Sequence, residues 1–272
     1  MKNPRIAFIG GGHMAGAMIA GSLRSGLPAA QIRVGEPVAE QRELLQQRFG
    51  VAASADNASV VSGATLIVLA VKPQELERVL RALAPAITSP ATLLLSIAAG
   101  IRVATIQDCC PAHPVVRCMP NRPALVGAGV SALYAPEDVD AAQRQQAEAV
   151  MAGCGKVCWV DHESQLDVVT ALSGSGPAYF FWLAEQMAGA ATRLGLDPDV
   201  ASRLAAETLY GAGQLAHLDQ NLAAQRAAVT SKGGTTEAAL SVLGRGELLV
   251  ADAIKAAADR SAALSASATK ST

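Results

Sequence analysis

Three small residues near the start of the chain have the types and spacing needed to hold a diphosphate. Gly10 and Gly12 allow the backbone to turn sharply and approach an anion, and Ala15 allows the following helix to pack closely on a sheet. The first backbone N–H groups of that helix would face the anion. Glu36 ends the next apolar run, at about the spacing expected for the acidic residue of such a site. This pattern predicts a dinucleotide-binding fold.

A second set of groups could bind a small carboxylate: Ser231, Gly233, Gly234, Thr235 and Thr236. Their hydroxyl and backbone N–H donors surround two glycines at the start of a predicted helix, and could form a concave anion site. An ordinary helix start is also rich in such residues. Two threonines and a serine around paired glycines exceed what one helix cap needs, and we therefore favour a role in substrate binding.

The reaction is constrained by the absence of lysine between Lys156 and Lys232. A hydroxyacid dehydrogenase of this organisation needs a base for the hydroxyl proton, and a lysine is expected on the first helices of its second domain. A cyclic imine can be protonated by water, so that orientation against a nicotinamide supplies most of the acceleration. We favour imine reduction and keep the hydroxyacid dehydrogenase as an alternative. A third possible function is a non-catalytic dinucleotide sensor, but a sensor would not need the substrate loop at 231–236.

Short apolar runs alternate with helical patterns over residues 1–160, which predicts an α/β domain with a mainly parallel sheet. Strands are expected at 6–10, 32–35, 66–70, 93–97, 115–119, 130–134 and 156–160, and helices at 14–25, 38–49, 74–84 and 102–109. The later strands are close together in the sequence and could run antiparallel at one edge. Ligands of parallel sheets lie beyond the carboxyl ends of the strands, so the turns after these strands should form the cofactor site.

Beyond Asp161 the strand pattern stops and helical patterns follow. Helices are expected over 178–193 and 198–217, with Gly195 ending the first and Asp197 capping the second. A last helix carries Leu248 to Lys255.

The tail from Ser261 is small and polar and is expected to fray. We place the domain boundary near 162. Residues 1–162 then form a Rossmann-type dinucleotide-binding domain, and residues 163–272 an all-α dimerisation and substrate-binding domain.

The helices at 178–193 and 198–217 are apolar on more than one face. A domain of about 110 residues has too little volume to bury several such helices. The burial partner is therefore expected to be another copy of the chain, in an intertwined homodimer or a larger assembly. The aromatic cluster Tyr179–Trp182 is expected in the core or the interface.

Composition excludes several classes of function. A formal net charge of −1 over 272 residues leaves no basic face for nucleic acid or for a membrane surface. No apolar run reaches membrane length and no signal-peptide pattern opens the sequence, so a cytoplasmic protein is expected. The five cysteines match neither a disulfide framework nor a metal site, and are expected to be reduced and buried.

The chain closely resembles the pyrroline-5-carboxylate reductases, the enzymes of the last step of proline biosynthesis. The resemblance runs from about residue 5 to 260 and rests on Phe8–Ala15, Val71–Pro73, Ser96–Gly100, Arg117–Asn121, Leu172–Tyr179 and Val229–Thr236. It implies NAD(P)H-dependent reduction of 1-pyrroline-5-carboxylate to L-proline by hydride transfer to the cyclic imine. It also implies a homodimer through the helical domain, with dimers often gathered into a decamer of five.

The resemblance also assigns roles by position. The diphosphate would be held by Gly10, Gly11, Gly12, His13, Met14 and Ala15, with Asn57 near the adenosine. Ala70, Val71, Lys72 and Pro73 would line the cofactor's path, and Ala98 and Ala99 would lie near the nicotinamide. The substrate pocket would be walled by Met119, Asn121, Ser175, Gly176 and Pro177. Ser231, Gly233, Gly234 and Thr235 would cradle the carboxylate, and Thr236 would hydrogen-bond the ring nitrogen as the catalytic residue.

Four residues depart from the family pattern. His13 stands where asparagine is common, Arg122 where threonine is usual, and Lys232 where proline is usual. Glu36 replaces a small hydroxyl residue that often accepts the 2′-phosphate of NADP. A carboxylate would bond the free ribose hydroxyls of NAD and repel that phosphate, which predicts a relative shift toward NADH. Arg33 and Arg42 nearby could offset this repulsion, so both NADH and NADPH stay open as cofactors.

Overall fold

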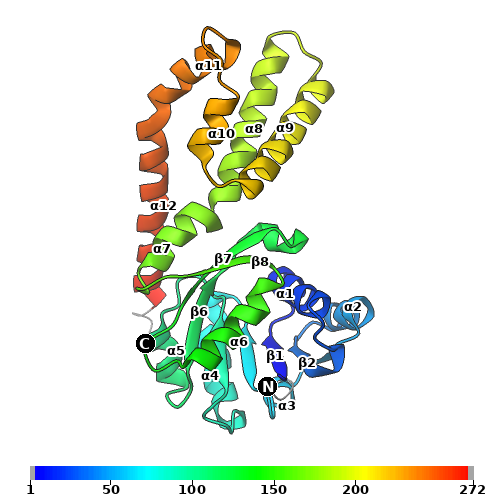
Figure 1. Cartoon of the computed structure of the whole chain (residues 1–272). Coiled ribbons are helices and arrows are strands. Elements are labelled where there is room, and N and C mark those ends of the chain that lie inside the picture. The colour runs from blue at the N-terminus through cyan, green and yellow to red at the C-terminus, as the bar shows by residue number, and fades with distance from the viewer. Residues whose placement is uncertain (1–3, 269–272) are drawn as a thin grey trace. The chain divides into compact units, whose positions relative to one another are not determined.

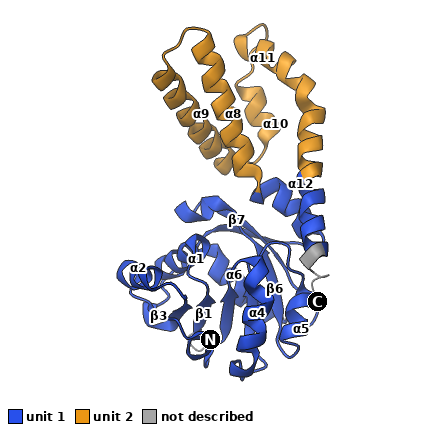
Figure 2. Cartoon of the chain, turned by 180° about the vertical axis from the view of Figure 1, so that it is seen from behind, with its two compact units in different colours: residues 1–174, 257–272 blue, residues 175–256 orange. Residues whose placement is uncertain are grey.

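The computed structural model describes residues 4–268, which form two compact units. Unit 1 comprises the described residues up to Gly174 and from Ala257 onward, and unit 2 comprises residues 175–256, blue and orange in Figure 2. The boundary expected near residue 162 is a different division of the chain, and it stays a prediction. Within the described range, no helix is both long and apolar enough to cross a membrane.

Unit 1 contains one eight-stranded sheet in the order β3-β2-β1-β4-β5-β6-β7-β8. The strands are β1 (Ile6–Ile9), β2 (Ile32–Gly35), β3 (Ala52–Ser54), β4 (Leu66–Leu69), β5 (Leu93–Ser96), β6 (Val115–Met119), β7 (Gly129–Tyr134) and β8 (Gly155–Trp159). Every neighbouring pair is parallel except β6 and β7, which are antiparallel. The predicted mainly parallel sheet is confirmed. Antiparallel pairing occurs among the later strands, at β6 and β7, whereas the edge pair β7–β8 is parallel.

Helices cover both faces of this sheet (Figure 1). They are α1 (His13–Arg24), α2 (Ala39–Phe49), α3 (Asn57–Val61), α4 (Pro73–Leu83), α5 (Val103–Cys109), α6 (Ala141–Ala152) and α7 (Gln165–Val169). Successive side chains of a strand point to opposite faces, so Ile6 and Phe8 join the core with Met18 of α1, and Ile9 joins the core with Leu76 of α4. Burial on both faces explains why β1 has no polar residue.

Unit 2 is helical, as predicted. Its helices are α8 (Gly176–Arg193), α9 (Pro198–Leu218), α10 (Leu222–Ala228), α11 (Thr235–Leu243) and the first part of α12 (Glu247–Ala268). Between α8 and α9, Gly195 has a φ of +101°. Asp197 then caps α9, since its Oδ1 accepts hydrogen bonds from Asp199 N at 3.0 Å and Val200 N at 3.1 Å. Both boundary signals in the sequence are confirmed.

Large apolar side chains of unit 2 are exposed to solvent. Phe180 and Phe181 are each 60% exposed and Trp182 is 56% exposed, although all three lie on one helix. Buried hydrophobic residues in unit 2 are Ala201 and Ala205 alone. A monomer rarely exposes so much apolar surface, so unit 2 needs a protein partner to cover it.

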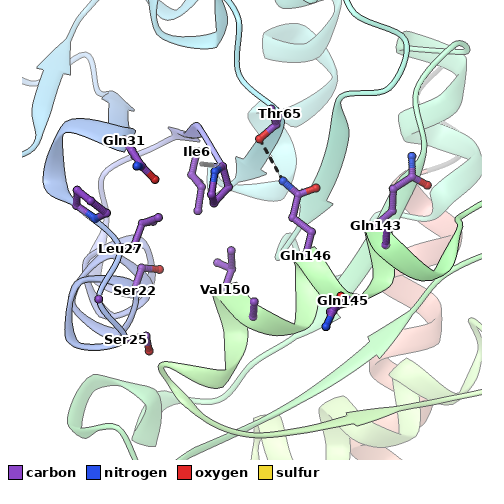
Figure 3. Close-up of a pocket in the computed structure, with 15 residues that line it drawn as sticks. Ile6, Ser22, Ser25, Leu27, Gln31, Thr65, Gln143, Gln145, Gln146 and Val150 are labelled. Carbon is purple, nitrogen blue, oxygen red and sulfur yellow. Dashed lines mark hydrogen bonds between the residues drawn. The ribbon is translucent and has the colours of Figure 1, made fainter. Parts of the chain in front are cut away.

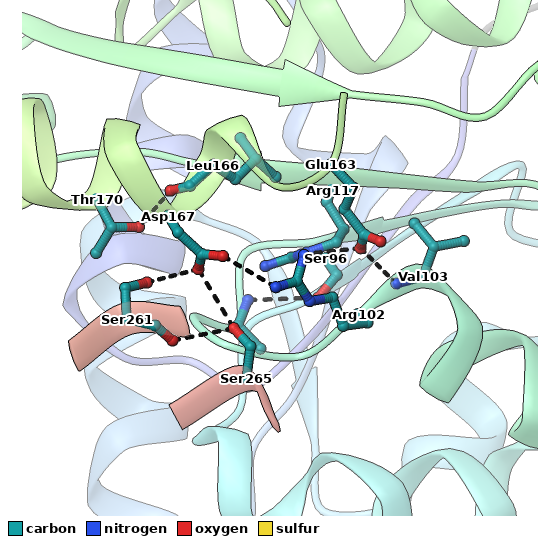
Figure 4. A network of polar contacts seen from close by, with 11 residues as sticks. Ser96, Arg102, Val103, Arg117, Glu163, Leu166, Asp167, Thr170, Ser261 and Ser265 are labelled. Atoms are coloured by element: carbon teal, nitrogen blue, oxygen red, sulfur yellow. Dashed lines mark hydrogen bonds and ion pairs between the residues drawn. The ribbon is translucent and has the colours of Figure 1, made fainter. Parts of the chain in front are cut away.

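The expectation that the chain frays from Ser261 is wrong up to Ala268, because α12 continues to that residue. The hydroxyl groups of Ser261 and Ser265 donate to Asp167 Oδ1 at 2.8 and 3.3 Å (Figure 4). The other oxygen, Asp167 Oδ2, accepts from Arg102 Nη2 at 2.9 Å. This network ties the end of α12 to α7 and to the residue before α5. Residues 269–272 of the predicted tail lie outside the described range.

A second carboxylate beside this network anchors β6. Glu163 Oε1 accepts from Arg117 Nη1 at 2.8 Å and from Val103 N at 2.7 Å (Figure 4). Arg117 is only 5% exposed, so this ion pair is largely desolvated. Removing either partner would leave a buried charge without its counter-charge, and the pair therefore holds the end of β6 firmly in place.

Candidate active site

Gly10 ends β1 in a left-handed turn at the carboxyl edge of the sheet. Its φ is +99°, and a Cβ atom here would lie 2.6 Å from Ala70 O. The N–H of Gly10 donates to Gly35 O at 2.8 Å, and Ala70 N donates to Ile9 O at 2.8 Å. The turn therefore lies between the ends of β2 and β4, where the strand order reverses around β1. Doubly wound sheets bind their ligands at this position.

The peptide groups of Gly11 are held by two side chains that follow β2. Its N–H donates to Glu36 Oε2 at 2.9 Å, and its carbonyl oxygen accepts from Gln41 Nε2 at 2.6 Å. The other carboxylate oxygen of Glu36 accepts from Val38 N at 3.0 Å. A Cβ atom on Gly11 would lie 2.6 Å from Leu45 Cδ1, so a larger residue here would require the Leu45 side chain to move. Glu36 was predicted as a site residue from its spacing, whereas no sequence motif points to Gln41.

The first turn of α1 is open to solvent. Gly12 is the N-cap residue, no side chain caps this helix, and a Cβ atom on Gly12 would meet nothing within 4 Å. Gly12 and His13 are exposed and Met14 is half-buried, whereas Ala15 is 1% exposed and packs in the core. Backbone N–H groups at the start of α1 are thus free to bind an anion. The residues present fit the diphosphate of a dinucleotide.

The other predicted cofactor residues lie after β3, β4 and β5 at the same edge of the sheet. Asn57 begins α3 and is half-buried, and its Oδ1 has no hydrogen-bond partner among the described residues. A Cβ atom on Gly35 would collide with this oxygen, so Asn57 lies directly against the end of β2. Ala98 is buried and donates its N–H to Ser96 Oγ at 3.3 Å, while Ala99 is exposed. The structure therefore brings these loops to the edge that carries Gly10.

The loop after β4 leads into α4. Ala70 and Val71 are half-buried, and the carbonyl oxygen of Ala70 lies against Gly10. Lys72 is the N-cap residue of α4 and is exposed, and Pro73 is the first residue of that helix. Proline at this position lacks only an N–H that would have no partner in the helix. The sequence Val71–Pro73 thus stops β4 and starts α4 within one short turn.

Asn121 ties the loop after β6 to two other elements. Its Oδ1 accepts from Val130 N at 2.9 Å, and its Nδ2 donates to Ser173 O at 3.1 Å. Ser173 belongs to η4 (Thr170–Gly174), a π-helical turn. Met119 lies beside the same turn, since a Cβ atom on Gly174 would be 2.7 Å from Met119 Cε. A direct contact of Asn121 with a ligand would therefore use the second N–H of its amide.

The glycine-rich loop before α11 has an open helix start of its own. Gly233 has a φ of +74°, and Gly234 is the N-cap residue of α11 without a side-chain cap. Gly234 N donates to Ser231 O at 3.0 Å. Glu237 Oε2 accepts from Gly233 N at 2.7 Å, so a carboxylate already binds one of the predicted cradle donors. Glu237 was not predicted, although a glutamate three residues beyond the N-cap glycine of a helix is a recognisable sequence signal.

The remaining predicted substrate residues open two helices of unit 2. Ser175 is the N-cap residue of α8, Gly176 is buried, and Pro177 follows it in the first turn. Thr235 and Thr236 are the first two residues of α11, exposed and half-buried respectively. The other predicted substrate residues, Met119 and Asn121, belong to unit 1.

Four cysteine thiols are buried and have raised pKa values. Burial raises the pKa of Cys110 and Cys154 to about 11, and it raises the pKa values of Cys109 and Cys118 as well. These thiols stay protonated near neutral pH and behave as small apolar residues. None of the described cysteines is in a disulfide. The expected buried thiols are found at four positions, whereas Cys158 is exposed.

Known proteins match both halves of the chain. The family described as "Pyrroline-5-carboxylate reductase dimerisation" matches residues 163–264, and the family described as "NADP oxidoreductase coenzyme F420-dependent" matches residues 5–100. A pyrroline-5-carboxylate reductase of Pseudomonas aeruginosa is 48% identical over 268 residues, which cover 97% of this chain and 98% of that protein.

Solved structures agree with these matches. A pyrroline-5-carboxylate reductase from Coxiella burnetii is 37% identical with a TM-score of 0.93, covering 97% of this chain and 99% of that one. A pyrroline carboxylate reductase from Plasmodium falciparum with NADP bound is 25% identical with a TM-score of 0.82, again covering 97% and 99%. The predicted dinucleotide-binding fold with a helical dimerisation region is thereby confirmed. Over nearly its whole length, the chain belongs to the pyrroline-5-carboxylate reductase family.

Proposed function

We propose that this chain reduces 1-pyrroline-5-carboxylate to L-proline with NAD(P)H, the last step of proline biosynthesis. The observation that carries the proposal is the 48% identity to the Pseudomonas aeruginosa enzyme over nearly the full length of both chains. The chain is an NAD(P)-dependent oxidoreductase, and its substrate is a small molecule. Its family includes a structure with NADP bound.

The open start of α1 and the turn at Gly10–Gly12 would hold the cofactor's diphosphate. Donors there are backbone N–H groups, and the helix start adds a partial positive charge. Ala70–Pro73 would line the cofactor, Asn57 would face the adenosine, and Ala98 and Ala99 would lie beside the nicotinamide. When bound, the reduced cofactor supplies a hydride.

Glu36 would face the adenosine ribose. Its carboxylate is buried, and a 2′-phosphate placed beside it would be repelled with little screening by water. The free 2′-hydroxyl of NADH could instead donate to the same carboxylate. We therefore expect the relative preference for NADH over NADPH to be higher than in relatives with a small hydroxyl residue here. Arg33 and Arg42 lie nearby in sequence, but Arg42 Nη1 already donates to Glu36 O at 2.9 Å.

By the family resemblance, the substrate ring would contact Met119, Asn121 and Ser175–Pro177, and its carboxylate would bind the loop at Ser231–Thr235. That loop supplies hydroxyl groups and the N–H groups at the start of α11. The substrate carboxylate would compete with Glu237 for Gly233 N, which makes the binding step an exchange of one carboxylate for another.

Thr236 would hold the ring nitrogen. The imine is protonated by water, so its carbon is electrophilic before hydride transfer. A hydride forms the new C–H bond, the π electron pair moves to nitrogen, and the hydroxyl group of Thr236 stabilises the resulting amine by a hydrogen bond. The protein's contribution is orientation and exclusion of water.

The hydroxyacid dehydrogenase alternative lacks its base. The segment from α7 to the end of α10 has no lysine, because none lies between Lys156 and Lys232. The sensor alternative is opposed by the substrate loop, which a sensor would not need.

The chain is a homo-oligomer, and we propose a homodimer through unit 2, with five dimers forming a decamer. The exposed aromatic side chains on α8 and the dimerisation match at 163–264 support the dimer. We also propose a cytoplasmic location, which suits free thiols in a reducing compartment.

One assay separates the three functions. Oxidation of NADH and NADPH is followed with pyrroline-5-carboxylate, and a panel of 2- and 3-hydroxy acids is tested in the reverse direction. We expect turnover with the imine and none with the hydroxy acids. Cofactor binding without turnover of any substrate would favour the sensor instead.

A further inference from the structure

A pocket of about 650 Å³ lies at the amino ends of β1 and β4 (Figure 3). This volume is in the usual range of small-molecule sites. One wall is the end of α1 with the segment that follows it, and the other is α6. The cofactor residues follow the carboxyl ends of the same strands, so the pocket is at the opposite edge of the sheet and separate from the proposed active site.

The pocket has an uncharged lining. Among its fifteen lining residues none is Asp, Glu, Lys, Arg or His, and Ile6, Leu27 and Val150 contribute apolar surface. An ion that entered would lose hydration and gain no counter-charge. The lining therefore favours a neutral molecule with an apolar body.

Two lining side chains have buried oxygens with unused hydrogen-bonding capacity. Ser22 is 4% exposed, and neither its Oγ nor Oε1 of Gln31 has a partner among the described residues. In Figure 3 both side chains extend from the α1 side toward the space in front of α6. Ser22 can donate and accept, whereas Gln31 Oε1 only accepts. A ligand that meets both must present a donor to Gln31 Oε1, and either a donor or an acceptor to Ser22 Oγ.

Two other polar side chains of the lining, those of Thr65 and Gln143, bond within the protein. Thr65 Oγ1 donates to Arg5 O and accepts from Arg5 N and Gln146 Nε2. Gln143 forms a reciprocal capping box with Asp140 at the start of α6. Ser25 and Gln145 add exposed polar side chains to the lining, and the buried groups left for recognition are the two oxygens described above.

Direct backbone contact fixes the two walls relative to each other. A Cβ atom on Gly21 would lie 2.5 Å from the carbonyl carbon of Gly153, so α1 and the end of α6 touch through two glycines. Arg24 Nη2 also donates to Gly153 O at 3.0 Å. A ligand would therefore not have to separate the helices. Because Ser22 Oγ and Gln31 Oε1 are themselves buried, these two side chains would have to rotate to reach the ligand.

We propose that this pocket binds a small uncharged molecule with an apolar body and a carboxamide-like end. The carboxamide N–H would donate to Gln31 Oε1, and its oxygen would accept from Ser22 Oγ. Apolar atoms would pack between Leu27 and Val150.

The test uses cyclohexanecarboxamide and its anionic counterpart cyclohexanecarboxylate with the full-length protein. Backbone amide NMR signals are recorded during titration of each compound. With the amide, signals of residues 22–31 and 142–150 should shift in a saturable way, and with the carboxylate they should stay in place. Ser22→Ala and Gln31→Leu should each weaken amide binding about fivefold, the value for one lost hydrogen bond.

A matched pair of variants tests the location. Ala149→Phe fills the pocket from α6 and should abolish binding of the amide. Glu148→Phe adds the same side chain at the neighbouring position, which does not line the pocket, and should leave binding of the amide unchanged. Melting temperatures report whether each variant folds. The proposal is overturned if neither compound shifts the pocket signals, if both shift them equally, or if Ser22→Ala and Gln31→Leu bind the amide as tightly as the parent chain.

Discussion

Glu36 Oε2 accepts a hydrogen bond from Gly11 N at 2.9 Å, so the carboxylate that we propose faces the cofactor's ribose also supports the glycine turn. Its second oxygen is bonded to Val38 N. Replacing Glu36 therefore changes two properties, the charge that meets the cofactor and the support of the turn. The experiments must separate them.

Glu36→Ser should raise the NADPH/NADH ratio of kcat/KM by on the order of tenfold, because the charge that repels a 2′-phosphate is removed. Glu36→Gln is the control, since it removes the charge but keeps an oxygen that can accept from Gly11 N. Both variants should move the ratio in the same direction. An unchanged ratio in both would remove Glu36 from cofactor selection.

Gly10→Ala should reduce the stability of the fold, whereas Gly12→Ala should weaken cofactor binding. Gly10 has a positive φ and no room for a Cβ atom, so its substitution should lower the free energy of unfolding by at least about 2 kcal/mol. Gly12 faces open space, and its substitution should leave the melting temperature nearly unchanged. The KM for the cofactor should nevertheless rise in Gly12→Ala, because the new methyl group points into the space proposed for the diphosphate.

Normal cofactor affinity in Gly12→Ala would place the diphosphate elsewhere. The measurements are thermal unfolding and cofactor titration on the same preparations, so that a folding defect and a binding defect are told apart.

Thr236→Ala should lower kcat/KM for pyrroline-5-carboxylate by roughly 5- to 100-fold, the range for a lost hydrogen bond to a charged group. Thr236→Ser keeps the hydroxyl group and should restore most of the rate. Steady-state kinetics at saturating cofactor check both variants. Equal activity in all three proteins would exclude Thr236 from the reaction.

Asp167→Ala should loosen the end of α12. It removes the acceptor of Ser261 and one of the two acceptors of Ser265, and it leaves Arg102 without its ion-pair partner, at a cost of about 2 kcal/mol. Hydrogen exchange of the backbone amides in residues 257–268 should become faster. Asp167→Asn keeps the shape of the side chain and one acceptor oxygen, so it should increase hydrogen exchange less than Asp167→Ala does. Unchanged exchange in Asp167→Ala would show that helix packing alone holds this segment.

Trp182→Glu should dissociate the proposed dimer. The side chain is 56% exposed in the single chain and lies on α8 with other exposed aromatics. Leu44→Glu on α2 is the matched control, because Leu44 is 51% exposed but belongs to unit 1. Sedimentation velocity should show a smaller species for Trp182→Glu alone. A Trp182→Glu protein of unchanged mass would place the interface on another face of unit 2.

The strands were predictable where burial on both faces demanded uninterrupted apolar residues, as in Ile6–Ile9 and Leu66–Leu69. β3 was not predicted, because Ala52–Ser54 is short and half-exposed and lacks the run of large apolar residues that marks a buried strand. Helices α3 and α6 were also missed, although Asp140 and Gln143 form a capping box that the sequence displays. The end of α12 was misjudged because its serines are stabilised by contacts distant in sequence.

The site was predictable where backbone geometry requires a residue type, as at Gly10. Hydrogen bonds between distant side chains and the backbone were not, and Gln41 to Gly11 is an example. No local pattern encodes such a bond, since it depends on how α2 packs beside the glycine turn. Asn121 was assigned to the substrate, yet the structure shows that both its amide oxygen and its nitrogen bind the protein.

The division of unit 1 between two separated segments affects synthesis of the chain on the ribosome. Ser261 and Ser265 reach Asp167 only after all of unit 2 has been translated. Translation proceeds at roughly 5–20 residues per second. For several seconds, therefore, the apolar helices of unit 2 have been synthesised while the carboxylate of Asp167 still lacks these two donors. The nucleotide-binding unit therefore finishes folding after translation of the helical one, although it begins first.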